Sequence, residues 1–122
     1  MKLSVFAAAL SIFAVSSAAY ADGDAVAGKS VFNKCAICHS AAPGKTIIGP
    51  TLFGVVGRPS ASVAGFSYSD AMKAANKTWD AATLDAYLTD PKAMVPGTKM
   101  TFAGLPKPED RANVIAYLAT LK

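Results

Sequence analysis

Two thiols and one imidazole stand close together in the segment Cys35-Ala36-Ile37-Cys38-His39. Residues at positions i, i+3 and i+4 of a helix share one face, so this spacing directs Cys35, Cys38 and His39 toward the same ligand. The C-x-x-C-H pattern is typical of covalent haem attachment, in which both thiols form thioethers and the histidine binds the iron. We therefore predict one covalently bound haem c as the cofactor.

Two other interpretations of the paired cysteines remain open at this point. A thioredoxin-like dithiol requires a preceding strand and a βαβ context, whereas an Ala-rich helical pattern precedes Cys35. A structural zinc site requires four ligands. The chain has one histidine and two cysteines, so only carboxylates could complete such a site. Haem attachment is favoured over both, and with both thiols bound to haem we expect no disulfide.

The second axial ligand of this iron cannot be another histidine of the chain, because His39 is the only one. Met, Lys, the N-terminal amine, water or a small ligand remain possible. A thioether ligand favours ferrous iron and raises the reduction potential. A methionine in a structured loop far from His39 in sequence is the natural candidate, and the chain offers Met72, Met94 and Met100.

The first 21 residues have the pattern of a secretory signal peptide. Lys2 supplies positive charge, residues 3–15 are mostly apolar, and Ala19-Tyr20-Ala21 fits a cleavage site before Asp22. The apolar run is too short for a comfortable membrane span. We expect residues 1–21 to be removed on export, and residues 22–122 to form a single periplasmic domain.

Charge and composition narrow the range of partners. The chain has twelve Lys and Arg residues against eight Asp and Glu residues. It has no Arg-rich stripe and no aromatic residues interleaved with basic ones, which argues against nucleic-acid binding. A moderate positive charge is better suited to an acidic protein surface.

Apolar spacing and capping residues predict four helical segments, at about 25–38, 70–75, 81–89 and 108–121. Asp24, Ser69 and Asp80 are the expected N-caps of the first three segments, and Pro91 ends the third. Strand signals are weak throughout. The loop over residues 40–67 is too long for an irregular loop in a small domain unless it wraps around a bound group. The sequence therefore predicts an all-α fold of about four helices with long loops wrapped around a covalent haem.

The segment Pro96-Gly97-Thr98-Lys99-Met100-Thr101-Phe102-Ala103-Gly104 resembles the methionine loop of class I cytochromes c. It resembles both the mitochondrial carrier and the small soluble bacterial members. Further matches include Gly49-Pro50-Thr51-Leu52, Thr78-Trp79 and Ile115-Ala116-Tyr117-Leu118, and they span essentially all of residues 22–122. Met72 and Ala93 depart from the mitochondrial pattern and favour a bacterial carrier.

This resemblance implies a role for each matching residue. Cys35 and Cys38 would form the thioethers, and His39 and Met100 would be the two iron ligands. The carbonyl of Pro50 would accept a hydrogen bond from the His39 ring and raise its basicity. Tyr68 and Trp79 would hydrogen-bond a haem propionate, with Arg58 nearby as a counter-charge. Tyr87 and Thr98 would line the methionine side of the haem.

The function implied by the resemblance is that of a soluble, monomeric one-electron carrier and not of an enzyme. Its partners would be redox proteins such as a bc1-type complex, a terminal oxidase, a photosynthetic reaction centre or a periplasmic dehydrogenase, with only peripheral membrane encounters. Four lysines near the motif and the methionine loop would steer docking: Lys34, Lys92, Lys99 and Lys107. A haem enzyme or gas sensor with an open distal site is the alternative.

Overall fold

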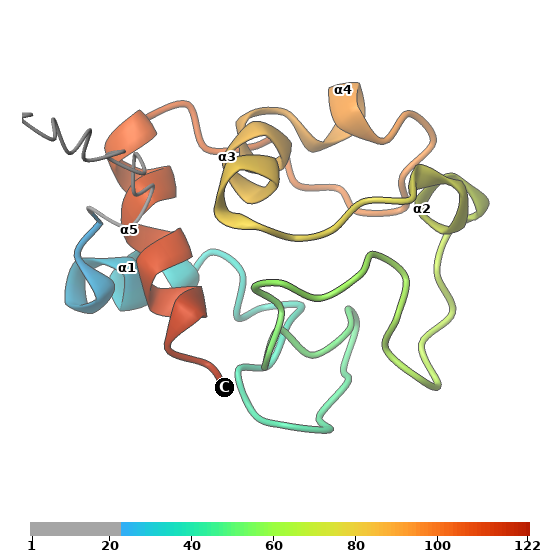
Figure 1. Cartoon of the computed structure of the whole chain (residues 1–122), viewed down its shortest axis with the longest axis horizontal. Helices are drawn as coiled ribbons and strands as arrows, with labels where there is room; N and C mark the ends of the chain where they lie inside the picture. Colours follow the sequence, from blue (N-terminus) through green and yellow to red (C-terminus); the bar gives the residue numbers. More distant parts are fainter. Residues whose placement is uncertain (1–22) are drawn as a thin grey trace, which may run out of the picture.

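Helices joined by long loops make up the part of the chain that this computed structural model describes, residues 23–122. The helices are α1 (Ala25–Phe32), α2 (Asp70–Ala75), α3 (Ala81–Thr89), α4 (Pro91–Met94) and α5 (Pro108–Ala119) (Figure 1). The only β-type pairing within these residues is an isolated bridge between Pro59 and Thr78. The all-α prediction is confirmed. The predicted signal peptide lies outside the described residues.

Side-chain caps explain where three of the helices begin. Asp24 accepts hydrogen bonds from the backbone N–H groups of the first turn of α1. Ser69 does the same for Met72 in α2, and Asp80 for Thr83 in α3. Each cap satisfies amides that have no partner inside their own helix. All three caps are those expected from the sequence.

Three details differ from the expected helices: the first helix ends earlier, the last one ends at Ala119 instead of about residue 121, and α4 was not expected. The first helix ends at Phe32 instead of Cys38, because the chain then continues in tighter turns, with the N–H of Cys38 donating to Cys35 O at 3.0 Å. The N–H of His39 also donates to Cys35 O, at 2.9 Å, which keeps one helix-like turn around the motif. Pro91 ends α3 and also begins α4, since Asp90 caps Ala93 and proline is well suited to a first turn.

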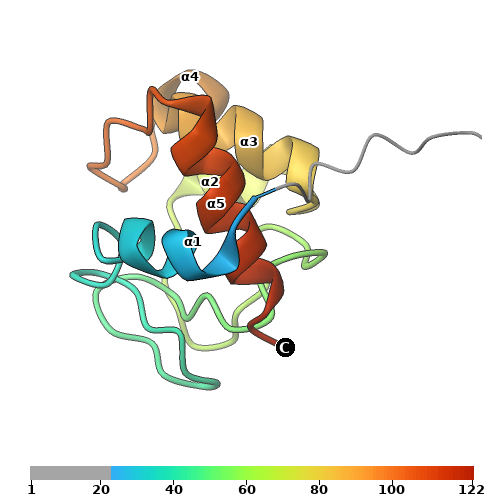
Figure 2. The ribbon, with the colours of Figure 1, turned by 90° about the vertical axis from the view of Figure 1, so that its left-hand side faces the viewer.

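The first and last helices cross in close contact (Figure 2). Gly28 makes this approach possible, because a Cβ atom there would overlap the carbonyl of Asn113 and lie 2.9 Å from Tyr117 Cβ. Next to this crossing the rings of Phe32 and Tyr117 pack with centroids 5.2 Å apart. The crossing fixes the start of the Cys35–His39 turn relative to α5.

The remaining loops surround the apolar interior. The long loop over residues 40–67 runs below the helices in Figure 1. Leu105, Val95 and Val114 are the most deeply buried apolar side chains. Other buried members come from α1, the long loop, the segment before α3, α3 and α5: Phe32, Val55, Trp79, Leu84, Tyr87, Ile115 and Leu118. Among residues 23–122, none of the helices has the length and apolarity of a membrane span.

Candidate haem-binding site

The ten residues predicted to contact a haem all line one cavity of about 500 Å³. They reach it from separate segments: the turn after α1, the long loop and its continuation up to α2, the segment between α2 and α3, α3 itself, and the loop between α4 and α5. On this wall lie Cys35, Cys38, His39, Pro50, Arg58, Tyr68, Trp79, Tyr87, Thr98 and Met100. Most of the other lining side chains are apolar, including Leu52, Val55, Phe66, Leu84, Val114 and Leu118.

The His39 ring is fixed by one backbone group. Its Nδ1 lies 2.7 Å from the carbonyl oxygen of Pro50. A carbonyl only accepts, so Nδ1 carries the hydrogen of the neutral imidazole and Nε2 keeps its lone pair for a metal. Burial lowers the pKa of His39, the bond to Pro50 opposes that shift, and the charge of Arg58 adds to it. The net effect favours the neutral form, the one that binds iron.

Gly49 lies directly against this ring. A Cβ atom at Gly49 would stand 2.7 Å from Nδ1 and 3.0 Å from Nε2 of His39. The N–H of Gly49 also donates to the carbonyl of Cys38 at 2.6 Å, which ties the loop to the C-x-x-C-H turn. The resemblance placed a glycine here, but its contact with the imidazole was not foreseen.

The two cysteines are unpaired and half-buried on the cavity wall. Burial raises the pKa of the Cys35 thiol, the neighbouring Cys38 adds to this, and Lys34 opposes it. Reactive dithiols have lowered thiol pKa values, so this environment is unlike that of a disulfide oxidoreductase. In the described part of the chain no group of three or more His, Cys, Asp or Glu side chains could hold a metal ion.

Met100 reaches the cavity from the loop between α4 and α5. The hydroxyl of Tyr87 donates to its sulfur at 3.8 Å, and its N–H donates to Thr98 Oγ1 at 3.2 Å. Burial raises the pKa of Tyr87, against the effect of Thr98, so the phenol remains a neutral donor. Met72 also lines the cavity, whereas Met94 packs against the core outside it.

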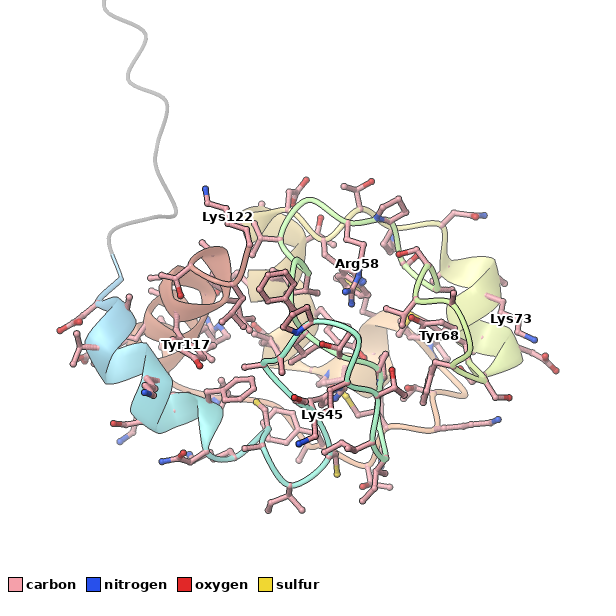
Figure 3. All side chains as sticks on the ribbon, turned by 90° about the horizontal axis from the view of Figure 1, so that it is seen from below. Lys45, Arg58, Tyr68, Lys73, Tyr117 and Lys122 are labelled. Atoms are coloured by element: carbon pink, nitrogen blue, oxygen red, sulfur yellow. The ribbon has the colours of Figure 1, made fainter. Side chains whose placement is uncertain are left out.

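Two of the residues predicted near the propionates, Arg58 and Tyr68, have hydrogen-bond partners within the chain. Arg58 donates to the carbonyls of Phe53 at 3.1 Å and Thr51 at 3.0 Å. The hydroxyl of Tyr68 accepts from the N–H of Val63 at 3.0 Å. Arg58 and Tyr68 are both labelled in the view from below (Figure 3). Their roles toward a propionate stay predictions.

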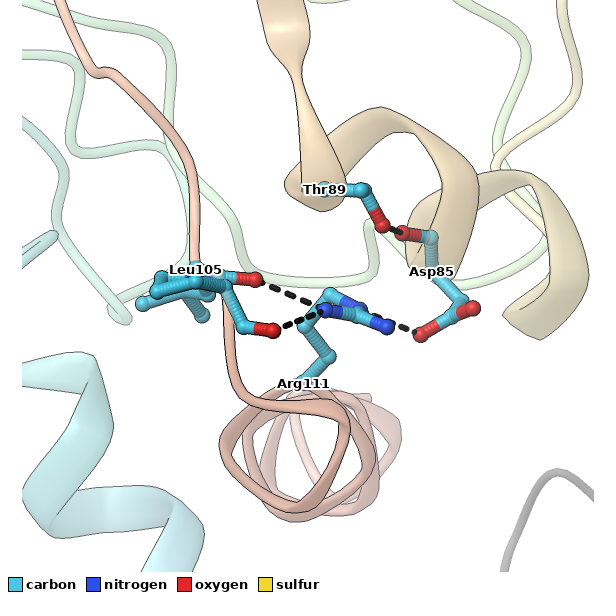
Figure 4. Close-up of polar contacts among 5 residues, drawn as sticks. Asp85, Thr89, Leu105 and Arg111 are labelled. Atoms are coloured by element: carbon cyan, nitrogen blue, oxygen red, sulfur yellow. Dashed lines mark hydrogen bonds and ion pairs between the residues drawn. The ribbon is translucent and has the colours of Figure 1, made fainter.

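Arg111 is a structural residue that sequence reasoning missed. From α5 it donates to Asp85 Oδ1 of α3 at 2.8 Å and to the carbonyls of Leu105 at 2.8 Å and Pro106 at 3.2 Å (Figure 4). These carbonyls belong to the chain that follows the Met100 loop. Only the position of Arg111 on the helix face occupied by Val114 and Leu118, three and seven residues later, could have indicated its burial.

The residues around the cavity fit a covalently bound haem. The cavity is largely apolar, as a porphyrin requires, and it brings together two unpaired thiols, an imidazole with Nε2 available and a thioether. His39 and Met100 would hold the iron, and Cys35 and Cys38 would form the covalent links. The donor set is that of a low-spin electron-transfer haem.

Comparisons with known proteins show which family the chain resembles. The profile of the cytochrome c family matches residues 25–122. The chain is 58% identical to cytochrome c2 of Rhodomicrobium vannielii over 106 residues, covering 86% of this chain and 85% of that one. It is 52% identical to cytochrome c2 of Rhodoblastus acidophilus over 101 residues, covering 82% and 94%.

Among solved structures, cytochrome cH from Methylobacterium extorquens matches with a TM-score of 0.77 and 46% identity, over 80% of this chain and 99% of that one. The chain belongs to the cytochrome c family. It is an electron carrier and not an enzyme, and it carries one covalently bound haem c.

Proposed function

We propose that the protein is a soluble periplasmic one-electron carrier whose haem iron is bound by His39 and Met100. The observation that carries the proposal is their placement: His39 and Met100 share a single apolar cavity with both cysteines. Met72 lines the same cavity, but Met100 is the methionine that Tyr87 and Thr98 hold by hydrogen bonds. Haem supplies an iron that accepts and releases one electron. The protein contributes a fixed ligand set, because Pro50 holds His39 and Tyr87 and Thr98 hold Met100.

The surroundings of the ligands support a carrier that changes little between redox states. Buried side chains such as Leu84 and Val114 line the cavity and exclude water. A dry site with a thioether ligand favours the reduced state and a high potential. Since neighbouring groups already hold His39 and Met100 in place, these two ligands need to move little when the iron gains or loses an electron.

We propose further that residues 1–21 direct export and that residues 22–122 act as a monomer outside the inner membrane. The sequence pattern of residues 1–21 supports this location. The partners would be membrane or periplasmic redox enzymes, such as a bc1-type complex as donor and a terminal oxidase as acceptor.

Carbon monoxide distinguishes this carrier from a haem enzyme or gas sensor. The ferrous holoprotein at neutral pH should resist carbon monoxide, since Met100 occupies the sixth position. It should also be reduced by a purified bacterial bc1-type complex and oxidised by a purified terminal oxidase. Rapid, tight binding of carbon monoxide together with failure to exchange electrons with either enzyme would refute the proposal.

A further inference from the structure

Gly49 is a glycine whose side-chain position is filled by the imidazole of His39. Its backbone does not require glycine, because its φ lies outside the left-handed region that Gly44 occupies in the same loop. The position is not open to solvent either, since Gly49 is buried. What excludes a side chain is the ring of His39. The need for glycine therefore comes from the proposed iron ligand and not from the course of the loop.

The contact lies over the face of the imidazole. A Cβ atom built on Gly49 would stand 2.5 Å from Cε1, 2.7 Å from Nδ1 and 3.0 Å from Nε2 of His39. A point in the plane of the ring, beyond Cε1, would be clearly farther from both nitrogens than from that carbon. Since the three distances are similar, the point lies above the ring. A Cα hydrogen of Gly49 therefore faces the flat side of the imidazole.

Gly49 and Pro50 restrain the ring in two different directions. The carbonyl oxygen of Pro50 lies 2.7 Å from Nδ1 and holds one edge of the ring. An N–H hydrogen lies in the plane of an imidazole, so this bond still permits the ring to rock about the line from Nδ1 to the oxygen. Gly49 lies against the face of the ring and blocks this rocking toward its own side.

Backbone hydrogen bonds fix this part of the loop to the residues on either side of His39. The N–H of Gly49 donates to Cys38 O at 2.6 Å, and the N–H of Leu52 donates to Ser40 O at 2.9 Å. Gly49 and Pro50 therefore cannot shift away from the ring unless these bonds break. The loop and the C-x-x-C-H turn hold the imidazole together.

We propose that Gly49 is a positioning residue that sets the plane of the His39 imidazole about its bond to the iron. This inference rests on the proposed carrier function, in which Nε2 of His39 binds the haem iron. Groups behind a metal ligand fix its orientation and thereby tune the metal. The plane of the imidazole decides which iron d orbital it overlaps, and therefore how the unpaired electron of the ferric protein is shared among the pyrrole rings. A side chain at position 49 would turn that plane.

The test compares Gly49→Ala with the matched control Gly44→Ala in the full holoprotein. A Cβ atom at Gly44 would meet nothing within 4 Å, but its φ of +69° strains an alanine there. Both variants should therefore unfold at lower guanidinium chloride concentration than the wild type, and both should keep the far-red band of thioether ligation. The proton NMR spectrum of the ferric protein separates them, because the haem methyl shifts report the distribution of the unpaired electron. These shifts should change in Gly49→Ala and stay as in the wild type in Gly44→Ala.

The wild type supplies a second measurement, which holds even if Gly49→Ala attaches no haem. In the diamagnetic ferrous holoprotein a nuclear Overhauser effect should connect a Cα hydrogen of Gly49 with the Cε1 hydrogen of His39. Its absence would overturn the inference, as would methyl shifts in Gly49→Ala equal to those of the wild type. A wild-type protein without the far-red band would instead contradict ligation by His39 and Met100, and with it the proposed function.

Discussion

His39 and Met100 are each held by a hydrogen bond that leaves one atom available for a metal. Pro50 occupies Nδ1 of His39, and Tyr87 approaches the sulfur of Met100 with its hydroxyl hydrogen. A sulfur atom has two lone pairs, so it can accept from Tyr87 and still bind iron. At the scale of residues, the site therefore offers a metal two ligands of different softness, the ring nitrogen of His39 and the sulfur of Met100.

Replacing Met100 by Ala should open the sixth position. The ferric protein would lose the weak far-red absorption band of thioether ligation, and the ferrous protein would bind carbon monoxide. The reduction potential would fall, because water or another hard ligand favours ferric iron. The measurement is an optical spectrum with a redox titration.

Met72→Leu and Met94→Leu are the controls for this experiment. Met72 lines the cavity and Met94 does not, and both leucine variants should keep the far-red band. Loss of the band in Met72→Leu, with its retention in Met100→Ala, would assign the ligand to Met72 and contradict the prediction.

Gly49→Ala should destabilise the protein through the imidazole it touches. The added methyl group would lie 2.7 Å from Nδ1 of His39, so either the loop or the ring must move. Overpacking of this kind costs about 1–3 kcal/mol. Guanidinium chloride unfolding of the holoprotein measures the loss. A variant as stable as the wild type would show that the ring moves freely.

The helices show how local chemistry sets element boundaries. The caps at Asp24, Ser69 and Asp80 could be predicted because capping is local: a short polar side chain just before a helix accepts hydrogen bonds from the backbone of its first turn. The end of α1 could not, since it depends on the turn geometry that brings Cys35 and Cys38 to the cavity. The four-residue helix α4 could not be predicted either. Pro91 was interpreted only as the end of the preceding helix, whereas it also begins α4.

Arg111→Met should loosen the chain that follows the Met100 loop. The substitution removes the donor of Leu105 O and Pro106 O and the partner of Asp85. Losing hydrogen bonds to a buried cation costs about 1.5–3 kcal/mol. Denaturant titrations followed by circular dichroism and by the far-red band measure the global loss and the release of Met100.

Asp85→Asn is the matched control for Arg111. It removes the charge pair with Arg111, whose partner Asp85 is 32% exposed, and leaves both carbonyl bonds in place. Its cost should stay below about 1 kcal/mol, as for other partly exposed pairs. Equal losses in Arg111→Met and Asp85→Asn would show that the ion pair, and not the carbonyl contacts, carries the stabilisation.

Asp80 should make the stability of α3 depend on pH. Hydrogen bonds from Thr83, first from its backbone N–H, lower the pKa of this carboxyl below its ordinary value. The charged cap therefore stabilises the folded state above about pH 3.9, the value of an unfolded Asp. That contribution is lost as the pH falls through the lower, folded-state pKa.

The comparison is between the wild type and Asp80→Asn, which keeps a capping oxygen but has no charge. Asp80→Asn should have the lower Tm at pH 7, and the difference should shrink as the pH falls through the folded-state pKa of Asp80, below which both caps are neutral. Thermal melts across this range supply the measurement. A difference that stays constant with pH would mean that the charge of Asp80 does not matter.

At the scale of the whole molecule, the cavity explains why the chain has long loops, because these loops form part of the cavity wall. Residues 40–67 have little regular structure, yet Pro50, Leu52, Val55 and Arg58 from this segment all reach the cavity wall. The covalent motif could be predicted because the spacing of its two thiols and its imidazole has a chemical cause, and the methionine loop because it resembles that of class I cytochromes c. The contacts of Arg111 could not be predicted, because they depend on which distant segments meet in space.

The chain should fold poorly without haem. A domain of this size buries a modest core, and its cavity of about 500 Å³ lies among the core residues Trp79, Leu84, Tyr87, Val114 and Leu118. A chain with Cys35→Ala and Cys38→Ala cannot form the thioethers and should give weak helical circular dichroism and no cooperative melt. A native-like, cooperative melt of that variant would contradict this expectation.

The most direct measurement is an optical spectrum of the purified holoprotein in both redox states, recorded with its pyridine haemochrome. We expect one haem c per chain, joined by two thioethers, and a ferric far-red band that disappears when the sulfur of Met100 is displaced. A spectrum without covalent haem, or with haem but no thioether band, would contradict an iron bound by His39 and Met100.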